Sequence, residues 1–406
     1  MKKQEVFKKL GLYVHIPFCI HKCAYCDFYS TDRFGQDGEH PQIKAYCKAL
    51  RYHLRMVGEK VTDYDVDSVY IGGGTPTALS SALLCSIVNE IKNDYYEADA
   101  LEWTVECNPA TSDYASLRRL RRCGVNRLSI GLQSANAQEL TALGRIHTKE
   151  EFEETFFQAR DAGFENINVD VMFGIPHQTQ DSLLETLSYI VSLEPEHISL
   201  YNLILEDGTP LFKKRESLVL PDENEEFAMY QAAIRFLAEN GYAQYEISNF
   251  AKEGYRCRHN LRYWQGEEYL GFGPAAHSYY AGHRFAIAKD TEQYIQIMRD
   301  KPKQLPADLL SENERIHRRD ELIEYIMLRL RLCEGIDCAD FAARFSGDFE
   351  AIFGKKCAVY VKHGFMQHQD NRYALTPKGM FVSNTIISSL FPDSVLEKSL
   401  KKGPRY

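Results

Sequence analysis

The feature that most constrains this chain is a repeated alternation between short apolar runs and helical segments, which continues to about residue 203. Six apolar runs are typical of strands: one directly before Cys19, and the others near 66–71, 101–106, 127–133, 166–173 and 197–203. Helical periodicity separates most of them, near 42–57, 79–93, 113–123, 149–162 and 179–193. Strands that alternate with helices favour a parallel sheet with right-handed crossovers. Because a closed barrel needs eight such units, we predict an α/β fold with a partial, open (βα)6 barrel.

The second half of the chain is organised differently. After a helix near 223–239 come aromatic-rich segments at 245–250, 259–264 and 270–280, which we predict to be loops. A short linker over 301–306 then precedes further helices and a hairpin over 364–375, a pattern typical of a small winged-helix domain. A chain of 406 residues is long for one domain. We therefore predict a barrel over 1–205, a barrel extension over 206–305, and a mostly helical, winged-helix-like domain over 306–406.

Composition excludes several classes of protein. The formal net charge of −9 disfavours extended contact with nucleic acid, and no apolar run approaches the length of a transmembrane helix. The 11 cysteines are odd in number and scattered beyond the first loop, which is not a disulfide framework. We therefore expect reduced thiols and a cytoplasmic protein.

Three cysteines, Cys19, Cys23 and Cys26, lie close together in the spacing CxxxCxxC, directly after the first predicted strand. Three thiolates can hold three corners of a metal centre and leave the fourth position open. One interpretation is zinc, with His15 or His21 as the fourth ligand, in a zinc-stabilised binding module; three unrelated core thiols are another. The third is a [4Fe-4S] cluster in which one iron has no protein ligand and binds a small chelating molecule by its amine and carboxylate.

Other candidate ligand-binding residues follow the predicted strands. The second strand enters Gly72-Gly-Gly-Thr-Pro76, where glycines allow backbone to come close to a ligand. Glu106, Gln133 and Asp170 each lie at or near the carboxyl end of a predicted strand, the face at which ligand sites gather in parallel α/β folds.

Together these motifs, in this order and along nearly the whole chain, resemble the radical S-adenosylmethionine (SAM) superfamily. The resemblance is to the branch that holds oxygen-independent coproporphyrinogen III oxidase and the HemW-type haem chaperones. It implies a [4Fe-4S] cluster on Cys19, Cys23 and Cys26, an electron donor, and reductive cleavage of SAM to methionine and a 5′-deoxyadenosyl radical. The residues that it implies at the SAM site are Tyr13, Tyr25, Gly73, Gly74, Thr75, Glu106, Gln133, Arg145 and Asp170.

This chain differs from the oxidase of that branch in two respects. The oxidase resembles this chain, but has a further cysteine where Phe28 stands, and an N-terminal extension where only 18 residues precede Cys19 here. His259-Asn-Leu-Arg-Tyr-Trp264 matches the HNxxYW motif of the haem chaperones, in which an imidazole can ligate iron beside aromatic rings. The resemblance thus implies a chaperone that binds haem or another tetrapyrrole, with His259 as an iron ligand, and passes it to acceptor proteins. Coproporphyrinogen oxidation is the alternative activity.

Overall fold

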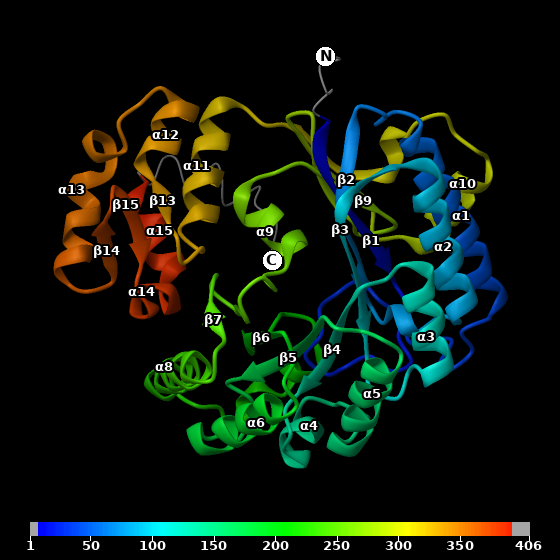
Figure 1. Cartoon of the computed structure of the whole chain (residues 1–406), viewed down its shortest axis with the longest axis horizontal. Helices are drawn as coiled ribbons and strands as arrows, with labels where there is room; N and C mark the ends of the chain where they lie inside the picture. Colours follow the sequence, from blue (N-terminus) through cyan, green and yellow to red (C-terminus); the bar gives the residue numbers. More distant parts are fainter. Residues whose placement is uncertain (1–6, 392–406) are drawn as a thin grey trace.

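The computed structural model describes residues 7–391 and contains a large mixed sheet wrapped by helices and a smaller second sheet (Figure 1). The large sheet has 12 strands in the order β12-β11-β10-β9-β1-β2-β3-β4-β5-β6-β8-β7. Its central strands β1 to β6 are parallel throughout. β6 then pairs with β8 and not with β1, so the sheet stays open. The predicted partial (βα)6 barrel is therefore confirmed.

The barrel elements lie close to the predicted ranges. The six strands are β1 (Lys8–Ile16), β2 (Tyr64–Gly73), β3 (Tyr96–Cys107), β4 (Arg127–Gln133), β5 (Ile167–Phe173) and β6 (His197–Asn202). The helices between and after them are α1 (Pro41–Gly58), α2 (Ser81–Asp94), α3 (Tyr114–Cys123), α4 (Ala137–Ala142), α5 (Lys149–Asp161), α6 (Gln180–Ser192), α7 (Pro210–Lys213) and α8 (Glu223–Glu239).

Strand β1 shows how the sequence separates the two faces of the sheet. Leu10, Leu12, Val14 and Ile16 are fully buried and belong to the main hydrophobic core. Each such side chain stabilises the fold by roughly 1.5–3 kcal/mol. The alternate residues, including Tyr13 and His15, point to the opposite face because side chains alternate along a strand. Polar residues at these alternate positions line the inside of the barrel.

The aromatic-rich segments predicted as loops are largely ordered elements, so that prediction was wrong. Residues 259–264 lie within a helix, and 270–280 contain two strands joined by a turn over 273–276, whereas 245–248 lie outside regular elements. The elements of this part are β7 (Ala243–Gln244), β8 (Asn249–Ala251), α9 (Arg258–Gln265), β9 (Tyr269–Phe272), β10 (His277–Tyr280), β11 (His283–Ile287), α10 (Thr291–Arg299) and β12 (Leu310–Arg315). β9 extends the sheet in parallel beside β1, and β10 to β12 continue it in antiparallel fashion.

Helix α9 was not predicted from the sequence, because the side chain that caps it comes from a distant part of the chain. Cys257, at its N-cap position, makes no side-chain capping bond. Instead, the Glu102 carboxylate on β3 accepts the backbone N–H groups of Arg258 at 3.1 Å and His259 at 3.2 Å. These are the groups that a local Ser, Thr or Asp would ordinarily cap.

The C-terminal part has its own three-stranded antiparallel sheet, in the order β13-β15-β14. The predicted hairpin forms β14 and β15, and the Thr376 hydroxyl caps α14 by accepting the Gly379 N–H at 3.2 Å. The elements are α11 (Arg318–Arg329), β13 (Ile336–Asp337), α12 (Cys338–Phe345), α13 (Phe349–Lys362), β14 (Met366–Gln369), β15 (Arg372–Leu375), α14 (Pro377–Phe381) and α15 (Ser383–Leu390). Because β12 still belongs to the large sheet, we propose that this domain begins after Arg315 and not at 306. Residues 392–406 of the predicted domain lie outside the described part.

The expectation that every thiol is reduced was wrong for one pair. Cys85 of α2 and Cys123 at the end of α3 form a disulfide with a Cα–Cα distance of 6.0 Å, and the other nine cysteines are free. The two residues are 38 positions apart, so only the packing of α2 against α3 brings them together.

We expect replacement of Arg262 by methionine to lower the free energy of unfolding by about 3 kcal/mol. The Arg262 side chain is only 3% exposed, and it pairs with Asp67 on β2 and with Glu267. Its removal leaves the partly buried Asp67 carboxylate without its cation. Urea unfolding measures the effect. The control is Arg256→Met, because Arg256 is 48% exposed in its pair with Glu334 and its loss should cost under about 1 kcal/mol.

Candidate functional site

The three cysteines Cys19, Cys23 and Cys26 lie on one closed loop between β1 and α1. The loop is closed at its base, where Cys19 N–H donates to Thr31 O and Thr31 N–H donates to Pro17 O, both at 2.9 Å. Cys19 is buried, and the other two cysteines are half-buried. The loop therefore presents three thiols from a single short segment, as predicted.

A second, smaller hydrophobic cluster attaches this loop to the rest of the barrel. Ala24 N–H donates to Leu143 O at 3.0 Å, and Leu211 N–H donates to Ala24 O at 2.9 Å. Tyr25 packs against the same cluster, whose buried members come from β5 and the connections after β4, β5 and β6: Leu143, Met172, Ile175, Leu203 and Leu211. Four separate parts of the barrel thus hold the cysteine loop in place.

The electrostatic surroundings of the thiols differ. Burial raises the pKa of Cys19 above its usual range and that of Cys26 to about 11, so these groups need a positive partner to become thiolates. Cys23 has one, because Arg145 Nη1 donates to its sulfur at 3.3 Å. The same guanidinium donates to Gly131 O at 2.8 Å and to Asn108 Oδ1 at 3.2 Å. Arg145 therefore lies beside the cysteine loop, between the ends of β3 and β4.

The glycine segment after β2 is bonded directly to the cysteine loop. Gly74 N–H donates to Ile16 O at 2.8 Å and Thr75 N–H donates to Phe18 O at 2.7 Å. A Cβ on Gly74 would lie 2.7 Å from Phe18 O, closer than packed atoms approach. Gly73 has φ +110°, and a Cβ there would overlap the His15 ring. These glycines are required for contact with β1 and the loop, which adds a structural reason to the ligand approach expected from sequence.

Glu106, at the end of β3, is buried and held by two donors. Tyr70 Oη donates to its Oε1 at 2.9 Å and Gly73 N–H donates to its Oε2 at 3.0 Å. Burial, and then the nearby charge of Asp170, raise the pKa of Glu106 to about 7. The carboxyl group is therefore close to the pH at which it changes charge, and a cation beside it would favour the ionised form.

Asp170 and Gln133 lie on the next two strands at the same face. Asp170 accepts from Asn168 Nδ2 at 2.8 Å and from Ser129 Oγ at 3.2 Å, and burial raises its pKa. Gln133 ends β4 with φ +69°, a conformation that non-glycine residues adopt mainly at special positions such as binding sites.

Tyr13, an aromatic residue predicted from sequence as part of the site, forms a hydrogen bond with His15. Tyr13 lies inside the barrel, where its hydroxyl joins His15 Nδ1 at 3.0 Å and its ring stacks on Tyr70. The other nitrogen of His15 donates to Tyr29 O at 2.8 Å. With both nitrogens engaged, and a pKa that burial lowers to about 4, His15 is a neutral structural residue. It is not available as the fourth ligand of a zinc ion.

His259 lies inside the barrel and is not an open ligand. Its ring is 1% exposed, and its nitrogens form hydrogen bonds with Ser68 Oγ at 3.1 Å and Tyr263 Oη at 2.8 Å. Burial lowers its pKa to about 3. Both ring nitrogens have partners in this conformation, so a role as an iron ligand would require one of these contacts to open and stays a prediction.

His259 connects the HNxxYW helix α9 to the strand-end residues. Its ring stacks on Tyr70 at 5.4 Å between centroids, and Tyr70 in turn holds Glu106. Tyr70 and Asn108 were not predicted from the sequence as members of the site, and His15 was considered only as a zinc ligand. Tyr70 could have been found from the alternation of β2, since it lies two residues before the glycine motif on the inward face.

The structure thus brings together the cysteine loop with Gly73, Gly74, Thr75, Glu106, Gln133 and Arg145 at or beyond the carboxyl ends of β1 to β4, and places Asp170 in the middle of β5 near Glu106. Glu106 and Asp170 are both carboxyl groups that accept hydrogen bonds from their neighbours, and burial raises the pKa of each. No three His, Cys, Asp or Glu side chains among residues 7–391 are grouped to hold a single metal ion. In a [4Fe-4S] cluster each thiolate binds a different iron.

This arrangement of barrel and cysteine loop defines a radical SAM protein, and comparison with known proteins agrees. Residues 13–190 match the Radical SAM superfamily, and residues 316–382 match the HemN C-terminal domain. Membership of the superfamily implies a [4Fe-4S] cluster and SAM.

The similarity to particular proteins is more specific. The chain is 33% identical to "Heme chaperone HemW" of Bacillus subtilis, over 93% of this chain and 98% of the relative. It is 32% identical to the protein of the same name in Escherichia coli, over 93% and 97% of the two chains. The solved structure of coproporphyrinogen III oxidase (HemN) from Escherichia coli superposes with a TM-score of 0.80, covering 96% of this chain and 91% of that one. At 23% identity this likeness shows the shared fold alone. The chain belongs to the HemW family of radical SAM proteins.

One further property concerns membranes. None of the helices in the described part of the chain is both long and apolar enough to cross a bilayer.

Proposed function

We propose that this protein holds a [4Fe-4S] cluster and SAM at the strand-end site, binds haem, and delivers haem to acceptor proteins. The observation that carries the proposal is the full-length similarity to relatives named heme chaperone HemW, together with the assembled cysteine loop. An electron donor and haem acceptors are the partners that this function requires. Cytoplasmic location and the absence of a nucleic-acid partner stay predictions from composition.

Each group of residues in the site would have a separate binding role. Cys19, Cys23 and Cys26 would hold three irons, and Arg145 would stabilise the Cys23 thiolate. Glu106 would pair with the ammonium group of SAM, and Asp170 and Gln133 would contact its polar groups from the neighbouring strands. Tyr13, Tyr25, Gly73, Gly74 and Thr75 would shape the space around it. When bound, the cluster and SAM supply one-electron reduction and a source of a carbon radical.

The shared fold supports the oxidase alternative, but the presence of phenylalanine at position 28 argues against it. The oxidase would have a cysteine at this position, whereas Phe28 is here 59% exposed beside the cysteine loop. For the zinc-stabilised module, His15 drops out as the fourth ligand because neither of its nitrogens is free, which leaves His21 as its candidate. We therefore propose haem handling and not porphyrinogen decarboxylation.

The role of His259 can be tested by haem titration of His259→Ala under anaerobic conditions. If haem binding opens the Tyr263 contact and His259 becomes an iron ligand, the affinity should fall about tenfold or more and the Soret band should shift. The control is His53→Ala, another buried histidine, which bonds Tyr294 at 3.0 Å and lies outside the HNxxYW motif. Unchanged affinity in His259→Ala would remove this residue as a haem ligand and leave it as a structural link to Tyr70.

A further inference from the structure

A row of polar side chains leads from Asp170 through the interior of the barrel, away from the strand-end residues. Asn168 lies two residues before Asp170 on β5 and is directly opposite His197, the first residue of β6. Tyr245, in the turn between β7 and β8, is bonded to His197. Asn168, His197 and Tyr245 are at most 2% exposed. Buried polar groups destabilise a fold unless they form hydrogen bonds, so the bonds within this row matter for each of its members.

The hydrogen bonds of this row all point the same way, toward Asp170. Asn168 Nδ2 donates to Asp170 Oδ1 at 2.8 Å, so the amide oxygen of Asn168 faces β6 and accepts from His197 Nδ1 at 2.6 Å. Tyr245 Oη lies 2.8 Å from the other ring nitrogen, His197 Nε2, and accepts the backbone N–H of Cys257 at 3.2 Å. Since the phenol oxygen already accepts this N–H, its own hydrogen is directed to His197. Hydrogen bonds that align in this manner polarise and strengthen one another.

His197 can complete this row in only one form of its ring. Its Nδ1 must carry the hydrogen, because the amide oxygen of Asn168 cannot donate, and its Nε2 must be free to accept from Tyr245. Burial, and then the positive charge of Arg127, lower the pKa of His197 well below its usual range. The imidazole therefore stays neutral, and its two neighbours fix its tautomer.

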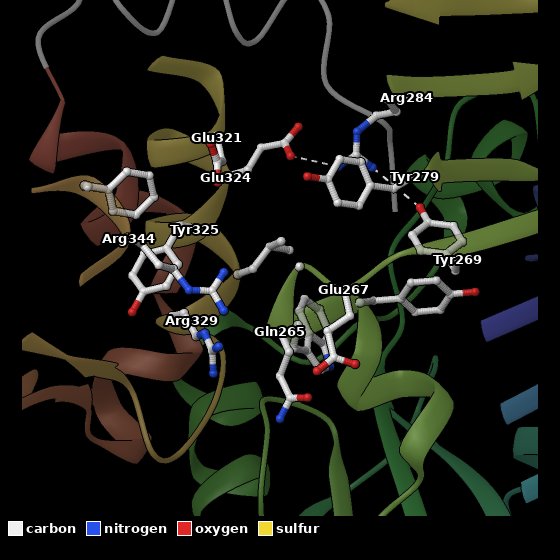
Figure 2. A pocket seen from close by; sticks show the side chains of 15 residues that line it. Gln265, Glu267, Tyr269, Tyr279, Arg284, Glu321, Glu324, Tyr325, Arg329 and Arg344 are labelled. Carbon is white, nitrogen blue, oxygen red and sulfur yellow. Dashed lines mark hydrogen bonds and ion pairs between the residues drawn. The ribbon is translucent and has the colours of Figure 1, made fainter. Parts of the chain in front are cut away.

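Tyr245, at the far end of the row, is held by both the barrel and the C-terminal domain. Its N–H donates to Asn249 O at 3.1 Å, and its carbonyl accepts the N–H of Cys333 at 3.0 Å. Cys333 follows α11 of the C-terminal domain, and α11 is joined to the barrel extension by the ion pair of Glu324 with Arg284 at 2.8 Å (Figure 2). The row of hydrogen bonds thus ends on a residue whose own position is fixed.

The row also fixes the direction of the Asp170 side chain. Asn168 Nδ2 donates to Asp170 Oδ1 and, at 2.7 Å, to Ser129 Oγ, which in turn donates to Asp170 Oδ2 at 3.2 Å. Both carboxylate oxygens therefore depend on the amide of Asn168, and that amide is oriented by His197 and by Ser199 Oγ at 3.1 Å. A carboxylate that is oriented before its ligand arrives binds more tightly, because less order has to be imposed on binding.

We propose that His197 and Tyr245 are positioning residues of the SAM site, which act through Asn168 on the orientation of the Asp170 carboxylate. This inference rests on the proposed function, because it takes Asp170 as a contact of SAM. It gives the start of β6 and the turn between β7 and β8 a part in SAM binding, although neither His197 nor Tyr245 belongs to the strand-end site.

Isothermal titration of SAM into the full-length, reconstituted protein tests this inference. His197→Leu should raise the Kd for SAM about tenfold, because the amide of Asn168 loses its partner. His197→Asn should restore most of the affinity, since its amide nitrogen can donate from the position of Nδ1. Tyr245→Phe, which removes a hydroxyl and keeps the ring, should raise the Kd about threefold. The control is His53→Leu, another buried histidine, whose partner is Tyr294 at 3.0 Å; its Kd should equal that of the parent.

A double-mutant cycle with Asp170→Asn distinguishes positioning from a general loss of structure. Asp170→Asn alone should weaken SAM binding, and adding His197→Leu to it should cause no further loss, because the row ends at this carboxylate. Independent, multiplying effects of the two substitutions would overturn the inference, and so would a folded His197→Leu protein that binds SAM as the parent does. Thermal unfolding and iron content establish folding, and if His197→Leu does not fold, the same cycle with Tyr245→Phe decides.

The outcomes separate this inference from the proposed function. Both contradicting results above come from a parent that binds SAM, so they would remove the positioning role and leave the SAM site standing. A parent that carries its full iron content and binds no SAM would overturn both.

Discussion

Replacement of Cys23 by serine is expected to abolish the iron-sulfur cluster. The parent, reconstituted anaerobically with iron and sulfide, should contain about four irons per chain and absorb broadly near 400 nm. The variant should lose most of this iron and absorbance, because two remaining thiolates cannot hold the cluster and Arg145 loses the sulfur that it contacts at 3.3 Å.

The matched control is Cys333→Ser, which removes a free, half-buried cysteine far along the chain from the loop. Its iron content should equal that of the parent. Equal iron in Cys23→Ser and the parent would show that the loop is not the cluster site. A colourless parent with one zinc per chain would instead support the zinc-stabilised module.

Replacement of Glu106 by glutamine is expected to weaken SAM binding and to remove its dependence on pH. Because the pKa of Glu106 is raised to about 7, the carboxyl group is ionised above that pH and neutral below it. The ammonium group of SAM pairs only with the ionised form. The affinity of the parent should therefore fall as the pH is lowered from 8 to 6, by up to about tenfold per unit below pH 7.

The Glu106→Gln variant should bind SAM about tenfold or more weakly at pH 8 and show a flat profile between pH 6 and 8. Isothermal titration of the reconstituted protein measures both quantities. Glu246→Gln is the control, because burial raises the pKa of Glu246 to about 7 as well, but this residue lies on the turn between β7 and β8. A profile in Glu106→Gln that still follows that of the parent would assign the titration to another group.

The network around Glu106 also links two motifs that are far apart in the sequence. His259 stacks on Tyr70, and Tyr70 donates to Glu106, so α9 supports the strand-end site from inside the barrel. A ligand that displaced the Tyr263 hydroxyl from His259 would act on the first member of this chain of contacts. Haem and SAM binding should then influence each other, because coupling between two sites is reciprocal.

The sequence predicted the barrel well because its signals are local. Alternating apolar residues, as in β1, and helix starts such as Ser80 before α2 depend on neighbouring residues only. The strand-end carboxylates followed from that prediction, since Glu106 and Asp170 end up at one face whenever the strands are parallel.

The remaining features depend on contacts between distant segments. Helix α9 is capped by Glu102 from β3, so its own flanking residues give no start signal. The disulfide requires α2 and α3 to pack side by side. The buried position of His259 depends on Ser68 and Tyr70 of β2, and a motif match cannot reveal that both of its nitrogens are engaged.

The most direct test of the whole account is one anaerobic assay of the reconstituted protein with SAM and a reductant, run in parallel with haem and with coproporphyrinogen III. We expect haem to bind in a one-to-one ratio and coproporphyrinogen III to be recovered unchanged. Conversion of coproporphyrinogen III to its decarboxylated product, without stoichiometric haem binding, would contradict the account and establish the oxidase activity instead.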